Sequence, residues 1–156
     1  MNRVLKLHAQ MEGKPFGKQL FSRAVARMAP YFKTIRPTVE ELRHNYIKVS
    51  MKKRKSVTNH LQSVHAIAMC NLCEFAGGIA MEASIPKHRR WIPRGMEVKY
   101  LKIAKTDLTA TCDLEGTDWE NCEAVPCYVS VKDTNGVEVM SAIIDMKVSE
   151  KPPKKS

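Results

Sequence analysis

The stretch that most constrains this chain runs from residue 64 to residue 83 and is apolar almost all the way round. At 3.6 residues per turn it leaves no broad polar face, because its apolar positions are Val64, Ile67, Ala68, Met69, Leu72, Phe75, Ala76, Ile79, Ala80 and Met81. Such a helix must be enclosed by the rest of the domain. His65, Asn71 and Glu74 interrupt it, so it lacks the roughly 20 unbroken apolar residues that span a bilayer. We expect a buried helix ended by Pro86, and no stable membrane insertion.

Two side chains of this helix carry possible chemistry. An unpaired buried carboxylate is costly, so Glu74 needs a structural or functional reason to be there. It follows His65 by nine residues, which at about 100° per residue puts the two side chains on opposite sides. If both serve one site, a second subunit must complete it. The alternatives are that Glu74 pairs with a lysine or arginine across a dimer and that His65 is a capping or core histidine.

The charge of the chain limits its partners. Lys and Arg outnumber Asp and Glu by 26 to 16, and much of the excess lies at residues 52–55, at 87–90 with Arg94, and at 151–155. A positive surface favours anions such as phosphates, nucleic acid or acidic lipid headgroups, whereas solvated loops are the alternative. Aromatic residues make up only 6% of the chain, and no RNP, KH or zinc-finger pattern is present. We therefore expect no nucleic-acid partner.

The cysteines indicate free thiols. They are Cys70, Cys73, Cys112, Cys122 and Cys127, and the single C-x-x-C lies inside the apolar helix rather than after a strand. A redox or zinc site is not expected there, and no metal or cofactor is implied. The first residues lack the apolar run and cleavage site of a signal peptide. Reduced thiols without an export signal indicate a cytoplasmic protein.

The remaining periodicity predicts one helix before the first strand and a sheet after the apolar helix. Apolar residues at helical spacing indicate a basic amphipathic helix over 18–28, which would pack on the domain or lie on a membrane surface. Alternation indicates strands at 46–51, 95–103, 108–114, 127–132 and 137–148, and Asn135-Gly136 predicts a hairpin between the last two. A sheet of this length can curl around one apolar helix, which is the α+β hotdog fold. We expect a helical segment at 1–36, a hotdog domain at 37–150 and a basic tail at 151–156.

The sequence resembles the hotdog-fold acyl-CoA thioesterases of the phenylacetate-pathway type, and more closely the DUF4442 branch. The resemblance rests on Asn59, His65-Ala66 and Glu74 in their order and spacing, together with the segment 95–102. It covers about residues 45–148. It departs from the usual pattern at Ala66, where relatives have glycine, and at Pro93, where several place a serine or threonine.

The resemblance implies a role for each matching residue. Asn59 would help to place water or substrate, although it could instead bond its own loop backbone. His65 would support that loop or the thioester, and the N–H of Ala66 would donate to the thioester carbonyl. Glu74 would act as general base or nucleophile. The chemistry is coherent, because thioester hydrolysis needs a carboxylate and donors for the oxyanion, and a helix N-terminus supplies aligned N–H groups.

We therefore predict hydrolysis of an acyl-CoA or acyl carrier protein thioester, by water attack assisted by Glu74 at the interface of a homodimer or tetramer. Gly77 and Gly78 would allow close approach of backbone or ligand, and Arg89, Arg90 and Arg94 would hold the phosphates of CoA. The alternative is a hotdog protein that binds acyl-CoA or a lipid-like ligand without turnover.

Overall fold

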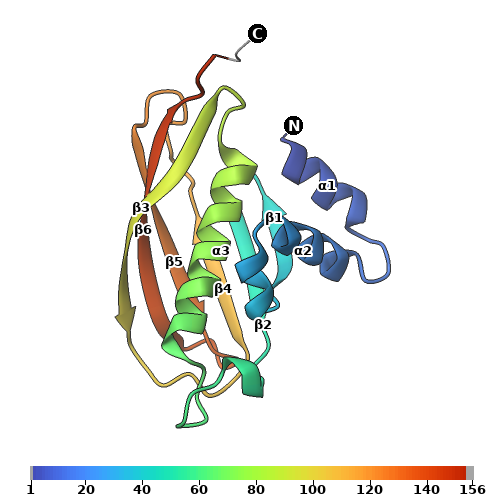
Figure 1. The fold of residues 1–156 in the computed structure, drawn as a ribbon, viewed down its shortest axis with the longest axis vertical. Coiled ribbons are helices and arrows are strands. Elements are labelled where there is room, and N and C mark those ends of the chain that lie inside the picture. Colours follow the sequence, from blue (N-terminus) through green and yellow to red (C-terminus); the bar gives the residue numbers. More distant parts are fainter. Residues whose placement is uncertain (1, 154–156) are drawn as a thin grey trace.

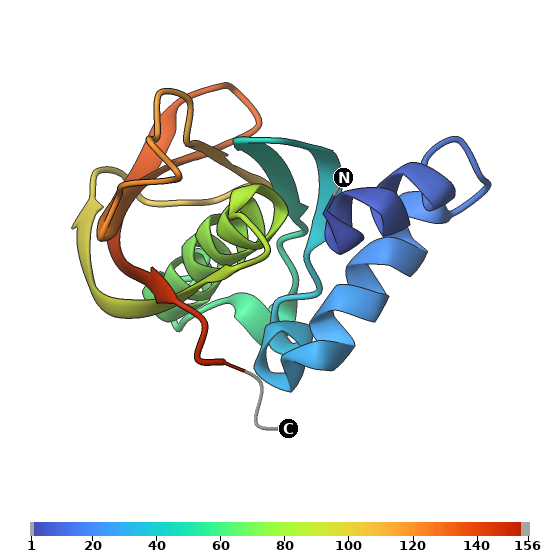
Figure 2. The ribbon, with the colours of Figure 1, turned by 90° about the horizontal axis from the view of Figure 1, so that it is seen from above.

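The structure is a computed structural model that describes residues 2–153 (Figures 1 and 2). The elements are α1 (Arg3–Met11), α2 (Gly17–Met28), the short 3-10 helix η1 (Pro30–Thr34), β1 (Thr38–Arg43), β2 (Tyr46–Met51), the 3-10 turn η2 (Lys55–Val57), α3 (Ala66–Ser84), β3 (Arg89–Tyr100), β4 (Leu108–Asp113), β5 (Ala124–Lys132) and β6 (Glu138–Glu150). Six strands form one antiparallel sheet in the order β1-β2-β4-β5-β6-β3, which curls around α3. This is the hotdog fold, as the sequence predicts.

Helix α3 fills the centre of the sheet. Leu72, Phe75, Ala76 and Ala80 are fully buried, and the helix packs against β2, β4, β5 and β6. It ends where Ile85 donates its N–H to the Met81 carbonyl, one residue before Pro86. In the described part of the chain α3 alone is long and apolar enough to cross a membrane, but 61% of its apolar 18-residue stretch is buried in the domain. It is therefore the core helix.

The enclosure of α3 is incomplete in a single chain, which corrects the expectation of a helix buried on all sides. Ile67, Glu74 and Glu82 are exposed on the side that faces away from the sheet. That side is covered only in part: η1 packs one flank, where Phe32 meets Phe75 edge-on at 5.1 Å between ring centroids, and Trp91 of β3 covers the other. The carboxylate of Glu74 thus avoids the desolvation that a buried position would impose.

The strands after α3 follow the predicted alternation with shifted ends. β3 begins at Arg89, earlier than the expected residue 95, because a bulge between Pro93 and Gly95 lets pairing with β6 continue past the proline. The predicted hairpin is present. The side chain of Asp133 accepts from the N–H groups of Asn135 and Val137, and Gly136 takes a φ of 77°.

Among the α-helices and strands, α1 and β1 were not predicted. The β1 sequence Thr-Val-Glu-Glu-Leu-Arg has a low intrinsic preference for strand, and pairing with β2 across the turn at Asn45 imposes the conformation. Helix α1 begins where the side chain of Asn2 accepts from the N–H of Val4, and its His8 packs on Phe21 of α2. Tertiary contacts therefore decide both elements.

The two edges of the sheet differ. Helix α2 lies along β1, where Phe21 and Val25 are buried and the Ser22 hydroxyl accepts from the N–H of Val39 at 2.8 Å. The N-terminal helices thus lie beyond β1, opposite β3 (Figure 1). β3 is the other edge strand and has no neighbour on its outer side within residues 2–153. Of the basic tail, residues 151–153 are exposed, and 154–156 lie outside the described residues.

Candidate active site

His65 is the N-cap of α3. Its Nδ1 accepts from the N–H of Ile67 at 3.1 Å, so the neutral ring carries its proton on Nε2, which remains free to donate. The N–H of Ala66 has no acceptor within residues 2–153. The capping role that the sequence left open is thus present, and it leaves the first amide of a 19-residue helix available for a negative charge.

Asn59 organises the loop before the helix. Its Oδ1 accepts from the N–H of Leu61 at 3.0 Å and from the N–H and hydroxyl of Ser63 at 3.2 and 3.0 Å. Its own N–H donates to the Ser63 carbonyl. This loop holds Val64 and His65 in position at the helix start, so Asn59 acts here on the backbone. Its contact with water or substrate stays a prediction.

A cavity of about 200 Å³ opens at the N-terminus of α3. It lies between η1, the loop after β2 and the first turns of the helix, and its lining consists of Tyr31, Thr34, Ile35, Ser56, Val57, Thr58, His65, Ile67, Ala68 and Asn71. The free end of the helix and the His65 ring therefore border a space that could receive a small polar group of a ligand.

Asn71 and Thr34 form a polar pair beside this cavity. The Thr34 hydroxyl donates to the Tyr31 carbonyl at 2.7 Å, so it can only accept from Asn71, whose Nδ2 lies 3.0 Å away. This fixes the orientation of the Asn71 amide. Its Oδ1 is buried and has no hydrogen-bond partner in the described part of the chain. Neither residue was among the predicted site residues, although an asparagine within an apolar helix was a signal that could have found Asn71.

Glu74 lies far from this end of the helix. At a rise of 1.5 Å per residue, its Cα is roughly 13 Å along the axis from that of His65. Its carboxylate is exposed and makes no ion pair or hydrogen bond within residues 2–153. A single chain therefore does not bring Glu74 to the Ala66 amide, as the angular argument predicts.

Gly77 and Gly78 let α3 approach its neighbours. A Cβ at Gly77 would lie 3.0 Å from the Ile144 side chain, and one at Gly78 would lie 3.2 Å from Trp91. Both glycines are buried. The close approach that they allow is therefore that of the helix to β6 and β3, which was one of the two expected alternatives. A contact with substrate stays a prediction.

The predicted phosphate-binding arginines differ in availability. Arg89 is only 6% exposed and donates to the carbonyls of Trp119 and Cys122, both at 2.6 Å. Arg90 and Arg94 are exposed, where Arg90 donates to Ser149 and Arg94 pairs with Asp145 at 2.9 Å. Arg89 therefore clamps the loop before β5 and has little capacity left for a ligand.

The basic run at 52–55 is also partly engaged. Lys52 pairs with Asp107 at 2.8 Å, and the guanidinium of Arg54 donates to the carbonyls of Thr34 and Ile35. Lys53 and Lys55 border a shallow hollow that also includes Asn59. Lys53 and Lys55 are thus the cations of this run that line the hollow beside Asn59 and form no ion pair within residues 2–153.

The five thiols are buried or half-buried in the structure. All five cysteines are free, and burial raises the pKa of Cys73 to about 12. The Cys70 sulfur lies 3.5 Å from the Tyr100 hydroxyl. No group of three metal-binding side chains occurs in the described residues. The C-x-x-C is therefore part of the helix packing.

Comparison with known proteins agrees with this architecture. A crystallised genomics target is 38% identical, covers 95% of this chain and 98% of its own length, and superposes with a TM-score of 0.84. A protein from Pseudomonas aeruginosa described as a probable thioesterase is 18% identical, with coverages of 83% and 93% and a TM-score of 0.76. A hypothetical thioesterase from Streptococcus pneumoniae, crystallised with coenzyme A, is 19% identical, with coverages of 74% and 90% and a TM-score of 0.63. The curated proteins contain no match.

The six-stranded sheet curled around α3 defines a protein of the hotdog fold. Residues 17–148 match the model of the family "Domain of unknown function (DUF4442)", which is most of the chain. The chain belongs to the DUF4442 family.

Proposed function

We propose that this protein hydrolyses an acyl thioester, with acyl-CoA as the substrate class. The observation that carries the proposal is the N–H of Ala66, which has no acceptor within residues 2–153 and lies at the start of a long helix capped by His65. His65, Ile67 and Ala68 from this helix start line the neighbouring cavity. A thioester carbonyl placed there would develop its negative charge against an aligned helix dipole. The Streptococcus pneumoniae neighbour was crystallised with coenzyme A, which supports the choice of coenzyme A as the thiol part of the substrate.

The reaction needs one water and one base. Water adds to the thioester carbonyl carbon, its proton passes to the carboxylate of Glu74, and the oxyanion is held by the Ala66 N–H. Collapse of the tetrahedral intermediate breaks the C–S bond, and the proton on Glu74 passes to the leaving thiolate. The products are a carboxylic acid and a free thiol. The Nε2–H of His65 is a second possible donor to the substrate.

The base would come from a second copy of the chain, because Glu74 lies too far from Ala66 within one copy. The long edge strand β3 is the natural place for pairing, since its outer side is open and it exposes Ile92, Met96 and Tyr100. A homodimer joined there, alone or within a tetramer, would bring the exposed Glu74 of one copy toward the helix start of the other. Free thiols are consistent with action in the reducing cytoplasm.

The test is Glu74→Gln, which keeps size and removes basicity. We expect kcat for acyl-CoA hydrolysis to fall by about 10²–10⁴-fold, the usual contribution of a general base. Glu74→Asp should keep part of the activity. The matched control is Glu82→Gln, an exposed carboxylate two turns further along α3, which should leave kcat unchanged.

Two results would contradict this mechanism. If Glu74→Gln leaves a measurable rate unchanged, the base lies elsewhere; if it unfolds the protein or separates the subunits, Glu74 is a structural partner. Gel filtration and light scattering should give a dimer or tetramer, and an active monomer at micromolar concentration would overturn the composite site.

The second candidate is a protein that binds acyl-CoA or a lipid-like ligand without turnover. It is favoured by the Cβ of Ala66, which would crowd an acyl chain, and by Pro93, where several relatives place a hydroxyl that could hold water. Thiol release from a panel of acyl-CoAs distinguishes the two functions. If none is cleaved, calorimetric binding of the same panel identifies the non-catalytic alternative.

A further inference from the structure

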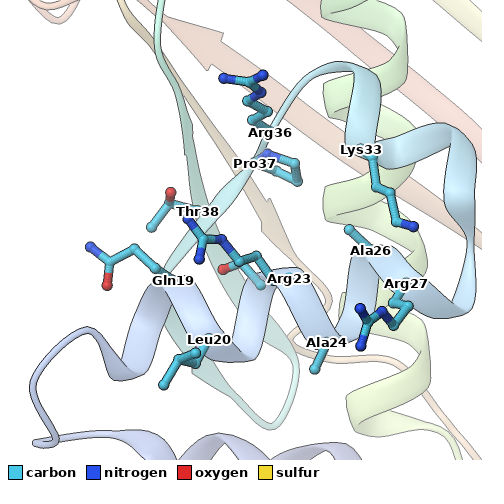
Figure 3. A pocket seen from close by; sticks show the side chains of 11 residues that line it. Gln19, Leu20, Arg23, Ala24, Ala26, Arg27, Lys33, Arg36, Pro37 and Thr38 are labelled. Atoms are coloured by element: carbon cyan, nitrogen blue, oxygen red, sulfur yellow. The ribbon is translucent and has the colours of Figure 1, made fainter.

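A cationic cleft of about 630 Å³ lies between α2, η1 and the segment entering β1, and it shares no lining residue with the cavity at the start of α3 (Figure 3). Its charged residues are Arg23, Arg27, Lys33 and Arg36, and none of its described lining residues is acidic. Figure 3 shows Arg23 and Arg27 extending from α2 and Lys33 extending from η1 toward the same hollow. Four cationic residues thus line one open surface.

The side chains of these four cations are unpaired in the described part of the chain. None of them forms an ion pair within residues 2–153, whereas Lys18 of the same helix pairs with Glu40 at 3.1 Å. Burial and the nearby charge of Arg36 both lower the pKa of Arg54. The cleft is therefore a region of uncompensated positive charge, which an external anion would stabilise.

Large apolar side chains project from the same part of the molecule. Phe16 is 76% exposed, Leu20 51% and Met28 86%. At about 100° per residue, Phe16, just before α2, and Leu20 share an arc with Arg23 and Arg27, whereas Met28 is the last residue of the helix and lies about 100° round from Arg27. The opposite arc, with Phe21 and Val25, packs on the domain. The helix therefore has a second, outward face on which apolar and cationic residues alternate.

The backbone holds two of these residues in an uncommon conformation. Phe16 has a φ of 59° and Arg36 a φ of 48°, both in the left-handed region that non-glycine residues seldom occupy. Phe16 precedes the first turn of α2, and Arg36 follows η1 at the other end of the cleft. The fold thus keeps an exposed phenylalanine and an exposed arginine at two ends of one surface at some conformational cost.

We propose that this face of α2 and η1 docks on an anionic phospholipid bilayer. Headgroup phosphates would be held in the cleft by Arg23, Arg27, Lys33 and Arg36, and Phe16, Leu20 and Met28 would enter the boundary between headgroups and acyl chains. The attachment is peripheral, because no helix of this face is inserted across the membrane. It does not depend on thioester hydrolysis.

A bilayer matches this surface better than an acidic protein or free phosphate does. A membrane presents negative charge and, a few ångströms below it, hydrocarbon, so it complements arginines and apolar side chains that are interleaved on one arc. Free phosphate would leave the apolar residues unexplained. A protein interface would require a contiguous apolar centre with a charged rim, and here the cations stand between the apolar side chains.

The experiment is co-sedimentation of the full-length protein with vesicles of phosphatidylcholine, with and without phosphatidylserine. We expect binding to the anionic vesicles that weakens at high salt, and little binding to the neutral ones. Arg23→Glu/Arg27→Glu should lower the partition coefficient by about tenfold or more, since each cation near an anionic surface contributes about a factor of five. The control Lys132→Glu/Lys147→Glu makes the same change of charge on the outer face of the sheet and should retain most binding.

A second variant separates docking from general attraction. Leu20→Ser/Met28→Ser keeps every charge and should also reduce binding severalfold, because it removes apolar area that enters the boundary. Circular dichroism checks that each variant stays folded. Competition with inorganic phosphate or glycerophosphoserine should fail to release the protein from vesicles.

Three results would overturn the proposal. The first is the absence of binding to anionic vesicles at low salt. The second is an equal loss of binding in the cleft variant and the sheet-face control, which would show that binding depends only on the net charge of the protein. The third is unchanged binding of the Leu20→Ser/Met28→Ser variant together with full release by free phosphate, which would make the cleft a site for soluble anions.

Discussion

The arginines of β3 and those around α2 are alike in charge but opposite in their surroundings. On β3, Arg89 donates to two carbonyls of the loop before β5, and Arg94 is paired with Asp145. Around α2, Arg23 and Arg27 have no ion-pair partner within residues 2–153. A run of basic residues in the sequence looks the same in both cases. Only the structure separates cations that hold the fold together from cations that are available to a ligand.

The largest effect that would test this contrast is on stability. Arg89→Met should lower the free energy of unfolding by about 3–5 kcal/mol, because two partly buried carbonyls lose a charged donor and the buried side chain is replaced. Arg23→Met should stay within about 0.5 kcal/mol, the usual range for an exposed side chain. Urea unfolding followed by circular dichroism measures both. Equal shifts in the two variants would show that Arg89 is not a structural clamp.

A smaller effect is expected on substrate binding, if the protein hydrolyses acyl-CoA. KM should rise with ionic strength more than kcat falls, because the phosphates of CoA are attracted by exposed cations. Arg90→Ala/Arg94→Ala should raise KM by about three- to tenfold, as expected for exposed charge pairs. Arg23→Ala/Arg27→Ala should leave KM unchanged. A KM that does not change with salt would show that the β3 arginines are solvated surface residues that do not attract CoA.

The smallest effect concerns the ion pair between Lys18 of α2 and Glu40. Burial raises the pKa of Glu40, but hydrogen bonds from Ser50 and Lys18 outweigh it and hold that pKa below its usual value. Because the pKa of Glu40 is lower in the folded state, its carboxylate stabilises the fold at pH values above its unfolded-state pKa, which is near 4.5. This stabilisation is lost as the pH falls through the folded-state pKa.

Glu40→Gln should therefore flatten the decline of unfolding free energy between about pH 5 and pH 3, by at most about 0.5 kcal/mol after solvent screening. Urea unfolding across this range checks it. If the variant loses stability as steeply as the wild type when the pH falls, carboxylates other than Glu40 cause the acid response.

The sequence predicts the fold well where hydrophobic pattern and burial agree. Helix α3, β2 and the Asn135-Gly136 hairpin follow from local signals, since each combines a clear period with an appropriate end or turn. β1 could not be found in this way, because its two glutamates lower its strand preference and its conformation depends on β2. The exposed flank of α3 was also missed, since periodicity shows that a face is apolar but not whether anything covers it.

The candidate site is predicted in part. The order of His65, Ala66 and Glu74 and their angular separation are properties of one helix, so the sequence could place them. The cap on Ile67 and the Asn59 loop are local as well. Thr34 could not be found, because it comes to Asn71 through the packing of η1 on α3, a contact between distant segments.

The bond from the Val39 N–H to Ser22 limits how many neighbours the sheet can accept. A sheet with two open edges can add a copy at each side and grow without end, whereas one sealed edge leaves each copy with a single free side. Here α2 occupies the β1 side. Pairing through β3 would therefore saturate after two copies and yield a closed, symmetric particle, so the same helix that keeps an arc free for other contacts also protects the chain against fibre formation.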